Sequence, residues 1–377
     1  MPTLSSAIFT STTSMINNTA ANEPSAPSFS GGYLLFLADS VDPAIAKTAF
    51  GLRDWASERC VGELALPAAT VSTGLPRLTV QQAWQHGARQ LVIGVASAGG
   101  LIPAHWVPAL VEALEAGLDI VSGMHVRLAD VAALREAAER HGRRLIDIRT
   151  PPAVIPIATG VRRSGRRLLT VGTDCALGKK YTALALTRGL RARGVDADFR
   201  ASGQTGILIA GGGIPIDAVV ADFVAGAAEL LSPAAAPDHL DVIEGQGSLF
   251  HPAYAGVTLG LLHGSQPDMF VVCHDPRRTH SLGYPAAPLP SIEAVIAQTV
   301  ALGRVTNPAI ACVGVSLNTA GMSESAAQSE IDALAQRLGL PVADPIRGGA
   351  DFERLLDACM GGMGGAVGVS EHGDLEM

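Results

Sequence analysis

The sequence is poor in charged and aromatic residues. Of its 377 residues only 16% are charged and 4% are aromatic, and the formal net charge is -8. A general nucleic-acid-binding protein carries basic stripes, so this balance argues against that class. No apolar run reaches the roughly 20 residues that a membrane-spanning helix needs, so we expect no membrane partner either.

Cysteines are also few. The five are scattered along the chain and none forms a CxxC pair, so we expect no structural zinc site and a reducing, cytoplasmic environment. The first 30 residues are rich in Ser, Thr, Asn and Ala and contain no Lys or Arg, whereas a secretory signal begins with positive charge. We interpret residues 1–30 as a disordered tail.

Length and glycine content favour two α/β domains with many tight turns. Strand and helix patterns alternate over residues 31–152, from YLLFLADS to RLIDIRTPP, and predict a Rossmann-like N-terminal domain with a parallel sheet. The proline pair Pro151 and Pro152 ends this domain. It contains no GxGxxG, so we assign no dinucleotide site to it.

Residues 153–360 predict a second domain, a doubly wound parallel sheet of the P-loop NTPase-like type, whose ligands bind beyond the carboxyl ends of the strands. Residues 153–167 are expected to form an exposed linker. Its arginine cluster RRSGRR is interpreted as a solvated surface or, because it adjoins the loop described next, as a phosphate-facing group. Residues 361–377 are interpreted as a flexible Gly-rich tail.

The segment VGTDCALGKKYTALAL resembles a phosphate-binding loop. A strand enters a glycine turn and an amphipathic helix follows, so backbone N–H groups and the helix N-terminus can surround a phosphate, which the lysine reaches. We expect cofactor contacts from this segment at Gly172, Thr173, Asp174, Gly178, Lys179, Lys180, Tyr181 and Thr182. A Ser or Thr usually follows the lysine, but here that position is Lys180.

The form GTDxxxGK resembles the dethiobiotin synthetase and cobyric acid synthase branch of P-loop enzymes, which activate carboxylates with ATP. In that branch the Thr after the lysine helps to hold magnesium, and here the nearest hydroxyl is Thr182. The resemblance also implies that Asn318, at the end of a later strand, contacts the nucleotide base. Lys180 therefore weakens the prediction of Mg-ATP chemistry.

Other strand ends carry the candidate catalytic and substrate-binding residues. Glu244, in DVIEGQG, resembles the metal-contacting Glu of the same branch; a carboxylate facing a phosphate loop needs a cation or a substrate amine between them, or else it caps backbone amides. His274 is either a general base or a hydrogen-bonded structural residue. The histidines near it lack metal-ligand spacing, and we predict no metal site. The candidates for binding a substrate carboxylate are Arg200, Gln204, Thr205 and Arg277.

Several long motifs together resemble the DUF1611 family. In the second half they are GTDCALGKKYTALAL, SGQTGILIAGGGIPIDAVVADFVAGAAE, VIEGQGSLFHPAYAGVTLGLLHGSQPD and HDPRR, and in the first half LADSVDPAIAKTAFGL, SAGGLIP, GLDIVSGMH and DIRTPP. The match covers nearly the whole chain outside its two ends. The resemblance implies N-acetylation of the amine of an acidic amino acid, D-glutamate.

Acetyl transfer from acetyl-CoA suits the altered loop, since it needs phosphate binding but no γ-phosphate and no obligatory magnesium. On this hypothesis Glu244 or His274 deprotonates the substrate ammonium, Arg200 or Arg277 holds its carboxylates, and backbone amides stabilise the oxyanion. Two alternatives stay open: an ATP- and Mg-dependent ligase or kinase-like enzyme, and a nucleotide-binding regulatory protein. The expected partners are a small-molecule amino acid and, by default, further copies of the chain in a homo-oligomer.

Overall fold

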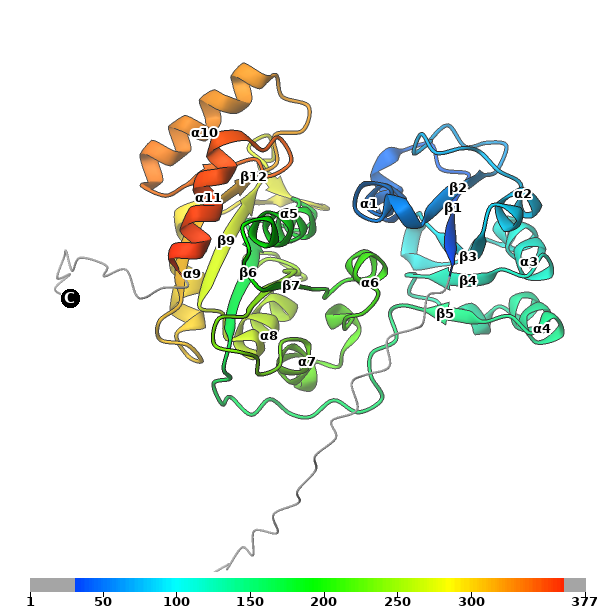
Figure 1. The fold of residues 1–377 in the computed structure, drawn as a ribbon, viewed down its shortest axis with the longest axis horizontal. Coiled ribbons are helices and arrows are strands. Elements are labelled where there is room, and N and C mark those ends of the chain that lie inside the picture. The colour runs from blue at the N-terminus through cyan, green and yellow to red at the C-terminus, as the bar shows by residue number, and fades with distance from the viewer. Residues whose placement is uncertain (1–30, 363–377) are drawn as a thin grey trace, which may run out of the picture.

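The computed structural model describes residues 31–362 (Figure 1). The tail predicted at residues 1–30, and residues 363–377 of the tail predicted at 361–377, lie outside the described residues, whereas Gly361 is the last residue of a helix. Two parallel sheets flanked by helices confirm the predicted α/β class. Among the described residues, no helix combines the length and the apolar character needed to cross a membrane.

The first sheet has five parallel strands in the order β2-β1-β3-β4-β5, which agrees with the Rossmann-like prediction. Its strands are β1 (Gly32–Ala38), β2 (Cys60–Ala65), β3 (Ala88–Ile93), β4 (Asp119–Ser122) and β5 (Leu145–Asp147). Its helices are α1 (Lys47–Trp55), α2 (Val80–Gln85), α3 (Val107–Glu115) and α4 (Ala132–His141).

The second sheet has six parallel strands in the order β13-β12-β9-β6-β8-β7. They are β6 (Arg166–Gly172), β7 (Ala197–Arg200), β8 (Leu240–Ile243), β9 (Met269–His274), β12 (Ala311–Leu317) and β13 (Val342–Ala343). The helices around it are α5 (Lys179–Ala192), α6 (Gln204–Ala210), α7 (Val224–Leu231), α8 (Ala255–Ser265), α9 (Ile292–Gly303), α10 (Glu324–Leu338) and α11 (Gly349–Gly361). The antiparallel hairpin of β10 (His280–Ser281) and β11 (Tyr284–Pro288) was not predicted from the sequence.

The side chains of the first sheet alternate between two cores, as the two-residue period of a strand requires. Leu34 and Phe36 of β1 face a core shared with α2, α3 and α4. Leu35 and Leu37 face the opposite side, where they pack with α1 and with Ile207 of α6. Figure 1 shows α1 and α6 between the two sheets. A helix of the second domain thus completes the core of the first.

The prediction of a solvated arginine cluster is wrong for Arg163 and Arg167, whereas Arg162 is exposed as predicted. Arg167 is 1% exposed, and its guanidinium donates to the carbonyl oxygens of Ser164 (2.9 Å) and Pro233 (3.0 Å). Arg163 donates to the carbonyl oxygen of Ser232 at 2.9 Å, and Arg162 pairs with a carboxylate. The phosphate-facing alternative fails too, because the cluster lies at the start of β6 and the loop at its end. Arg163 and Arg167 therefore link the start of β6 to residues 232–233, which follow α7.

Candidate functional site

The loop between β6 and α5 has the order that the sequence predicted. Gly178, with φ 116°, turns the chain into the helix that begins at Lys179. The Lys179 side chain is buried, and its ammonium donates to the carbonyl oxygen of Asp174 at 2.7 Å, so it lies within the curl of the loop. Burial lowers the pKa of Lys179. The backbone N–H groups of such a curl and the N-terminus of α5 favour a bound phosphate.

Two predicted cofactor residues instead hold the loop in place. Asp174 is fully buried, and its Oδ2 accepts hydrogen bonds from Arg278 Nη1 and from the backbone N–H of Leu282, both at 2.8 Å. The hydroxyl of Thr173 is hydrogen-bonded to Nδ1 of His274 at 2.9 Å. Neither of these loop residues lines the cavity described below, and neither does Gly172. Their contribution is the shape of the loop.

His274 was also a candidate general base, and the geometry favours the structural alternative. Its Nδ1 is occupied by Thr173, burial lowers its pKa, and the residue does not line the cavity. A base must reach the proton that it removes. We therefore leave Glu244 as the candidate base.

A second histidine lies beside the loop. Asp174, Cys175 and His251 place one ligand atom each within 4.8 Å of one another. However, Nδ1 of His251 accepts backbone hydrogen bonds from Ala253 (3.1 Å) and Tyr254 (3.3 Å), which puts the proton on Nε2. That N–H faces Asp174 Oδ1 at 3.7 Å. A protonated Nε2 neither ligates a metal nor deprotonates the thiol, so this cluster is not assigned a chemical role.

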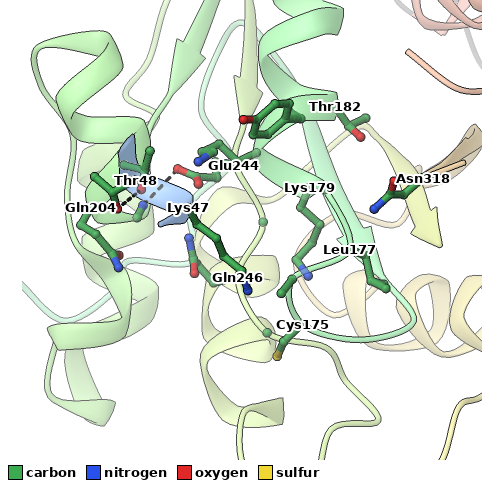
Figure 2. Close-up of a pocket in the computed structure, with 18 of the residues that line it drawn as sticks. Lys47, Thr48, Cys175, Leu177, Lys179, Thr182, Gln204, Glu244, Gln246 and Asn318 are labelled. Carbon is green, nitrogen blue, oxygen red and sulfur yellow. Dashed lines mark hydrogen bonds between the residues drawn. The ribbon is translucent and has the colours of Figure 1, made fainter. Parts of the chain in front are cut away.

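One cavity of ≈1280 Å³ contains most of the predicted site (Figure 2). It is lined by both domains, and Thr48 of α1 is hydrogen-bonded to Thr205 of α6 at 2.9 Å across the boundary. The predicted residues that line it are Gly178, Lys179, Lys180, Tyr181, Thr182, Gln204, Thr205, Glu244 and Asn318. Four residues that were not predicted from the sequence also line it, namely Lys47, Thr48, Gln246 and Ser316.

Glu244 follows β8 and is 5% exposed. One of its oxygens, Oε2, accepts hydrogen bonds from the backbone N–H groups of Ser202 (3.0 Å) and Gly203 (3.1 Å). Oε2 therefore caps backbone amides, as one of the two alternatives predicted, while Glu244 also lines the cavity. Burial raises the pKa of Glu244 to about 7, against the opposing effects of the Lys180 charge and the two amides. A carboxylate with a pKa near neutrality is suited to proton transfer.

Lys180 extends from α5 toward α1. A Cβ atom on Gly51 would lie 2.8 Å from Lys180 Nζ, so the absent side chain makes room for the ammonium. Burial lowers the pKa of Lys180 to about 8, while the charge of Glu244 acts in the opposite direction. The ammonium and the carboxylate thus interact at a distance, without a direct ion pair between them.

The hydroxyl nearest to the loop lysines is not free for a metal. The Oγ1 atom of Thr182 is buried and hydrogen-bonded to Oγ of Ser316 at 2.7 Å. Asn318 lines the same side of the cavity, where its Oδ1 accepts a hydrogen bond from the N–H of Ala320 at 3.2 Å. In place of the usual Ser or Thr, the loop therefore presents the ammonium of Lys180.

The two predicted carboxylate-binding arginines lie elsewhere. Arg200 Nε donates to Asp241 at 2.5 Å, and Arg277 forms an ion pair with Asp275 at 3.1 Å. Neither arginine lines the cavity. Their charges are already neutralised by neighbouring carboxylates, so the structure gives them no contact with a substrate in this cavity.

The fold and the loop define a P-loop protein that carries an N-terminal Rossmann-like domain. Residues 156–356 match a family model described as a domain of unknown function (DUF1611_C), P-loop domain, and residues 58–151 match one described as DUF1611_N, Rossmann-like domain. The chain belongs to the DUF1611 family, as its motifs predicted.

Similar proteins span almost the same length. A protein of Pseudoalteromonas sp named D-glutamate N-acetyltransferase is 47% identical over 319 residues, which cover 85% of this chain and 96% of that protein. One of Tritonibacter scottomollicae with the same name is 48% identical over 326 residues, covering 86% and 97%. The crystal structure of a DUF1611 family protein from Anabaena variabilis has a TM-score of 0.80 and 35% identity, and the match covers 88% of this chain and 99% of that one.

Proposed function

We propose that this protein is an N-acetyltransferase that transfers the acetyl group of acetyl-CoA to the amine of D-glutamate. The observation that carries the proposal is that a phosphate-binding loop and a buried carboxyl group with a pKa near 7 line one cavity. The names of the two curated relatives support the same activity. The cytoplasmic location, the homo-oligomer and the absence of a metal site stay predictions from the sequence.

The size of the cavity is consistent with two substrates. A site for one small molecule typically occupies roughly 300–1,000 Å³, and this cavity reaches ≈1280 Å³. The pyrophosphate of coenzyme A would contact the loop backbone and Lys179. Asn318, on the far side of α5 from Glu244, would contact the adenine of coenzyme A (Figure 2). The amino acid would then lie on the side of Glu244.

Lys180 favours coenzyme A over Mg-ATP as the bound phosphate compound. Magnesium in a P-loop is held partly by the hydroxyl that follows the loop lysine. Here that residue is a lysine, and the Thr182 hydroxyl is engaged by Ser316. Acetyl transfer needs phosphate binding at the loop but no metal at the γ-phosphate.

The reaction requires one proton acceptor. Glu244, in its carboxylate form, removes a proton from the substrate ammonium. The amine nitrogen then forms a bond to the thioester carbonyl carbon, the C–S bond breaks, and the thiolate of coenzyme A leaves with the second proton, which the nitrogen gives up as it becomes the amide. Backbone N–H groups of glycine turns outside the phosphate-binding loop would stabilise the oxyanion.

The test measures thiol release when the purified protein is incubated with D-glutamate and acetyl-CoA, or with D-glutamate and Mg-ATP. We expect free thiol and N-acetyl-D-glutamate in equal amounts, only when both D-glutamate and acetyl-CoA are present, and in EDTA as well as in buffer. Release of ADP and phosphate without acetyl-CoA would show the ligase chemistry instead. Nucleotide binding without any product would point to a regulatory protein.

A further inference from the structure

The distribution of lysine in this chain is unusual. Of its 27 cationic residues only three are lysines, namely Lys47, Lys179 and Lys180. All three line the cavity between the domains, although Lys47 belongs to the first domain and the other two to the second. Lysine and arginine are not interchangeable, since lysine offers a compact charge on a flexible stem. The chain uses lysine, therefore, only where this cavity needs a cation.

The three lysines also occupy positions that disfavour them. Lys47 is the first residue of α1, and Lys179 and Lys180 are the first two residues of α5. The N-terminus of a helix carries partial positive charge, so a cation there is unfavourable for the helix. Neither helix has a side-chain cap. These lysines do not serve helix stability, and a bound anion would relieve the charge at both helix ends.

Two of the lysines lack a carboxylate partner within the described residues. The cavity arginines Arg149 and Arg347 pair with Asp217 (2.6 Å) and Asp344 (3.8 Å). By contrast, no ion pair or hydrogen bond engages Lys47 or Lys180 in residues 31–362, and the Lys47 side chain extends from α1 into the cavity (Figure 2). Lys179 is engaged by the loop itself. Among the described residues, the cavity therefore presents two cations without an ion pair, one from each domain, and Glu244 as the lining carboxyl group that forms no ion pair.

We propose that Lys180 binds the α-carboxylate and Lys47 the side-chain carboxylate of the acidic amino-acid substrate. This inference rests on the proposed function. Glu244 takes the substrate ammonium, and Lys180 is the lysine whose charge interacts with Glu244. The ammonium and the α-carboxylate are bonded to the same carbon atom, so the α-carboxylate lies close to Glu244 and is bound by Lys180. Lys47, on the other domain, is left for the distant carboxylate.

The first domain thereby acquires a function that its sequence did not indicate. It contains no nucleotide-binding motif, but the start of its α1 selects the charge at the far end of the substrate. Gln204 and Gln246, from the second domain, supply amide groups beside Lys47 (Figure 2). Specificity for a dicarboxylate is then a property of the domain boundary, and the second domain alone would not have it.

The test compares D-glutamate with D-glutamine, which has the same size but no side-chain charge, by thiol release from acetyl-CoA. Lys47→Met should lower kcat/KM for D-glutamate by about 10- to 100-fold, the size expected for one charged contact, and change kcat/KM for D-glutamine by less than about twofold. Lys180→Met should lower kcat/KM for both substrates. Arg304→Met, which removes an exposed cation outside the cavity, is the matched control and should change neither.

A second measurement uses the unaltered protein, so it does not depend on a variant that folds. Reductive methylation with formaldehyde, followed by peptide mass spectrometry, reports each of the three lysines separately. D-Glutamate should slow the modification of Lys47, and D-glutamine should not. Equal protection by both amino acids, or a Lys47→Met enzyme that keeps its preference for D-glutamate, would overturn this inference alone. Wild-type protein that releases no thiol would instead refute the proposed function.

Discussion

At the scale of single residues, the proposed chemistry depends on Glu244 and Lys180. Burial raises the pKa of Glu244 to about 7 and lowers the pKa of Lys180 to about 8. Glu244 removes a proton only as the carboxylate, which exists above its pKa. Lys180 binds an anion only as the ammonium, which exists below its pKa. The two active forms therefore coexist mainly between these values.

We predict that kcat/KM for D-glutamate rises with pH up to about 7 and falls above about 8. Glu244→Gln should lower kcat by about 10²- to 10⁴-fold, as expected for loss of a general base, and remove the acid limb from the residual activity. Lys180→Arg, whose guanidinium stays charged, should remove the alkaline limb. The pH profile of thiol release checks both limbs. An unchanged acid limb in Glu244→Gln would assign the base to another group.

Lys179→Ala should weaken the binding of coenzyme A by more than about tenfold, because a charge-assisted contact to phosphate is lost within the loop. Titration calorimetry with coenzyme A measures this. Pantetheine, which lacks the nucleotide and its pyrophosphate, should bind both proteins alike. If Lys179→Ala binds coenzyme A as tightly as the wild type does, the loop is not the phosphate site.

The cavity residues that could be predicted from the sequence are those whose position follows from the pattern of the neighbouring residues. Lys179 lies at a strand-to-helix turn and Glu244 at a strand end, and both features are visible within a few residues. Arg200 ends a strand and Arg277 follows one, but each is neutralised by a neighbouring carboxylate, and such pairing depends on side-chain direction. Lys47 was missed because the packing of the first domain against the second brings it to the site, and no local motif indicates that contact.

At the scale of helices and strands, α1 is shaped around the side chain of Lys180. Gly51 lies in the middle of α1, where glycine costs a helix about 0.5–1 kcal/mol relative to alanine. An added Cβ would lie 2.7 Å from Thr205 Cγ2 and 2.8 Å from Lys180 Nζ. The helix therefore gives up some intrinsic stability in order to leave space for an ammonium group.

Gly51→Ala should accordingly displace Lys180 and lower kcat/KM by about tenfold, a change of about 1.4 kcal/mol in activation free energy, with little change in the melting temperature. Thiol release and differential scanning calorimetry measure the two effects. Gly361→Ala, where an added Cβ meets nothing within 4 Å, is the control for a Gly-to-Ala change in a helix. Full activity in Gly51→Ala would show that the position of Lys180 does not matter.

The arginine cluster at the start of β6 contains Arg167, whose burial was not predicted from the sequence. A basic run is most often solvated, but here the Arg167 guanidinium donates hydrogen bonds to backbone carbonyl oxygens, including those of Ser164 and Pro233. Arg167→Met should lower the free energy of unfolding by about 3 kcal/mol, because these buried oxygens lose their donor. Urea unfolding followed by circular dichroism measures it, with the exposed Arg304→Met as the control. A loss below about 0.5 kcal/mol would mean that water replaces the guanidinium.

At the scale of the whole molecule, the two domains share a hydrophobic core. Ala201, Ile207 and Leu208 of the second domain pack with Leu35 and other residues of the first sheet. Alternating strand and helix patterns predicted both sheets correctly, because each pattern is local. The shared core could not be predicted, since the same apolar face of α6 would also suit a helix that covers its own sheet.

We predict a single cooperative thermal transition for both domains, because separating them would expose the core that they share. Ile207→Asp, which puts a charge into the shared core, should split the transition into two. Ile207→Val should only lower its midpoint, since the lost methyl group costs about 0.5–1.5 kcal/mol. Differential scanning calorimetry distinguishes these cases. Two resolved transitions in the wild type would show that the domains unfold independently.

The hydrogen bonds between the phosphate loop and the β10–β11 region affect when the binding site can form during translation. Asp174 is held by Arg278 and by the backbone of Leu282, and Tyr181 donates a 2.7 Å hydrogen bond to Asp54 of the first domain. On a ribosome, the segment that contains the loop emerges about a hundred residues before the segment that fixes it. Domains generally fold as units, with the N-terminal one first. The sheet of the first domain emerges first, and α6 completes its second core, whereas the loop gains its final shape only after residues 278–282 have emerged. A nascent chain that stops before Leu282 therefore has no finished binding site.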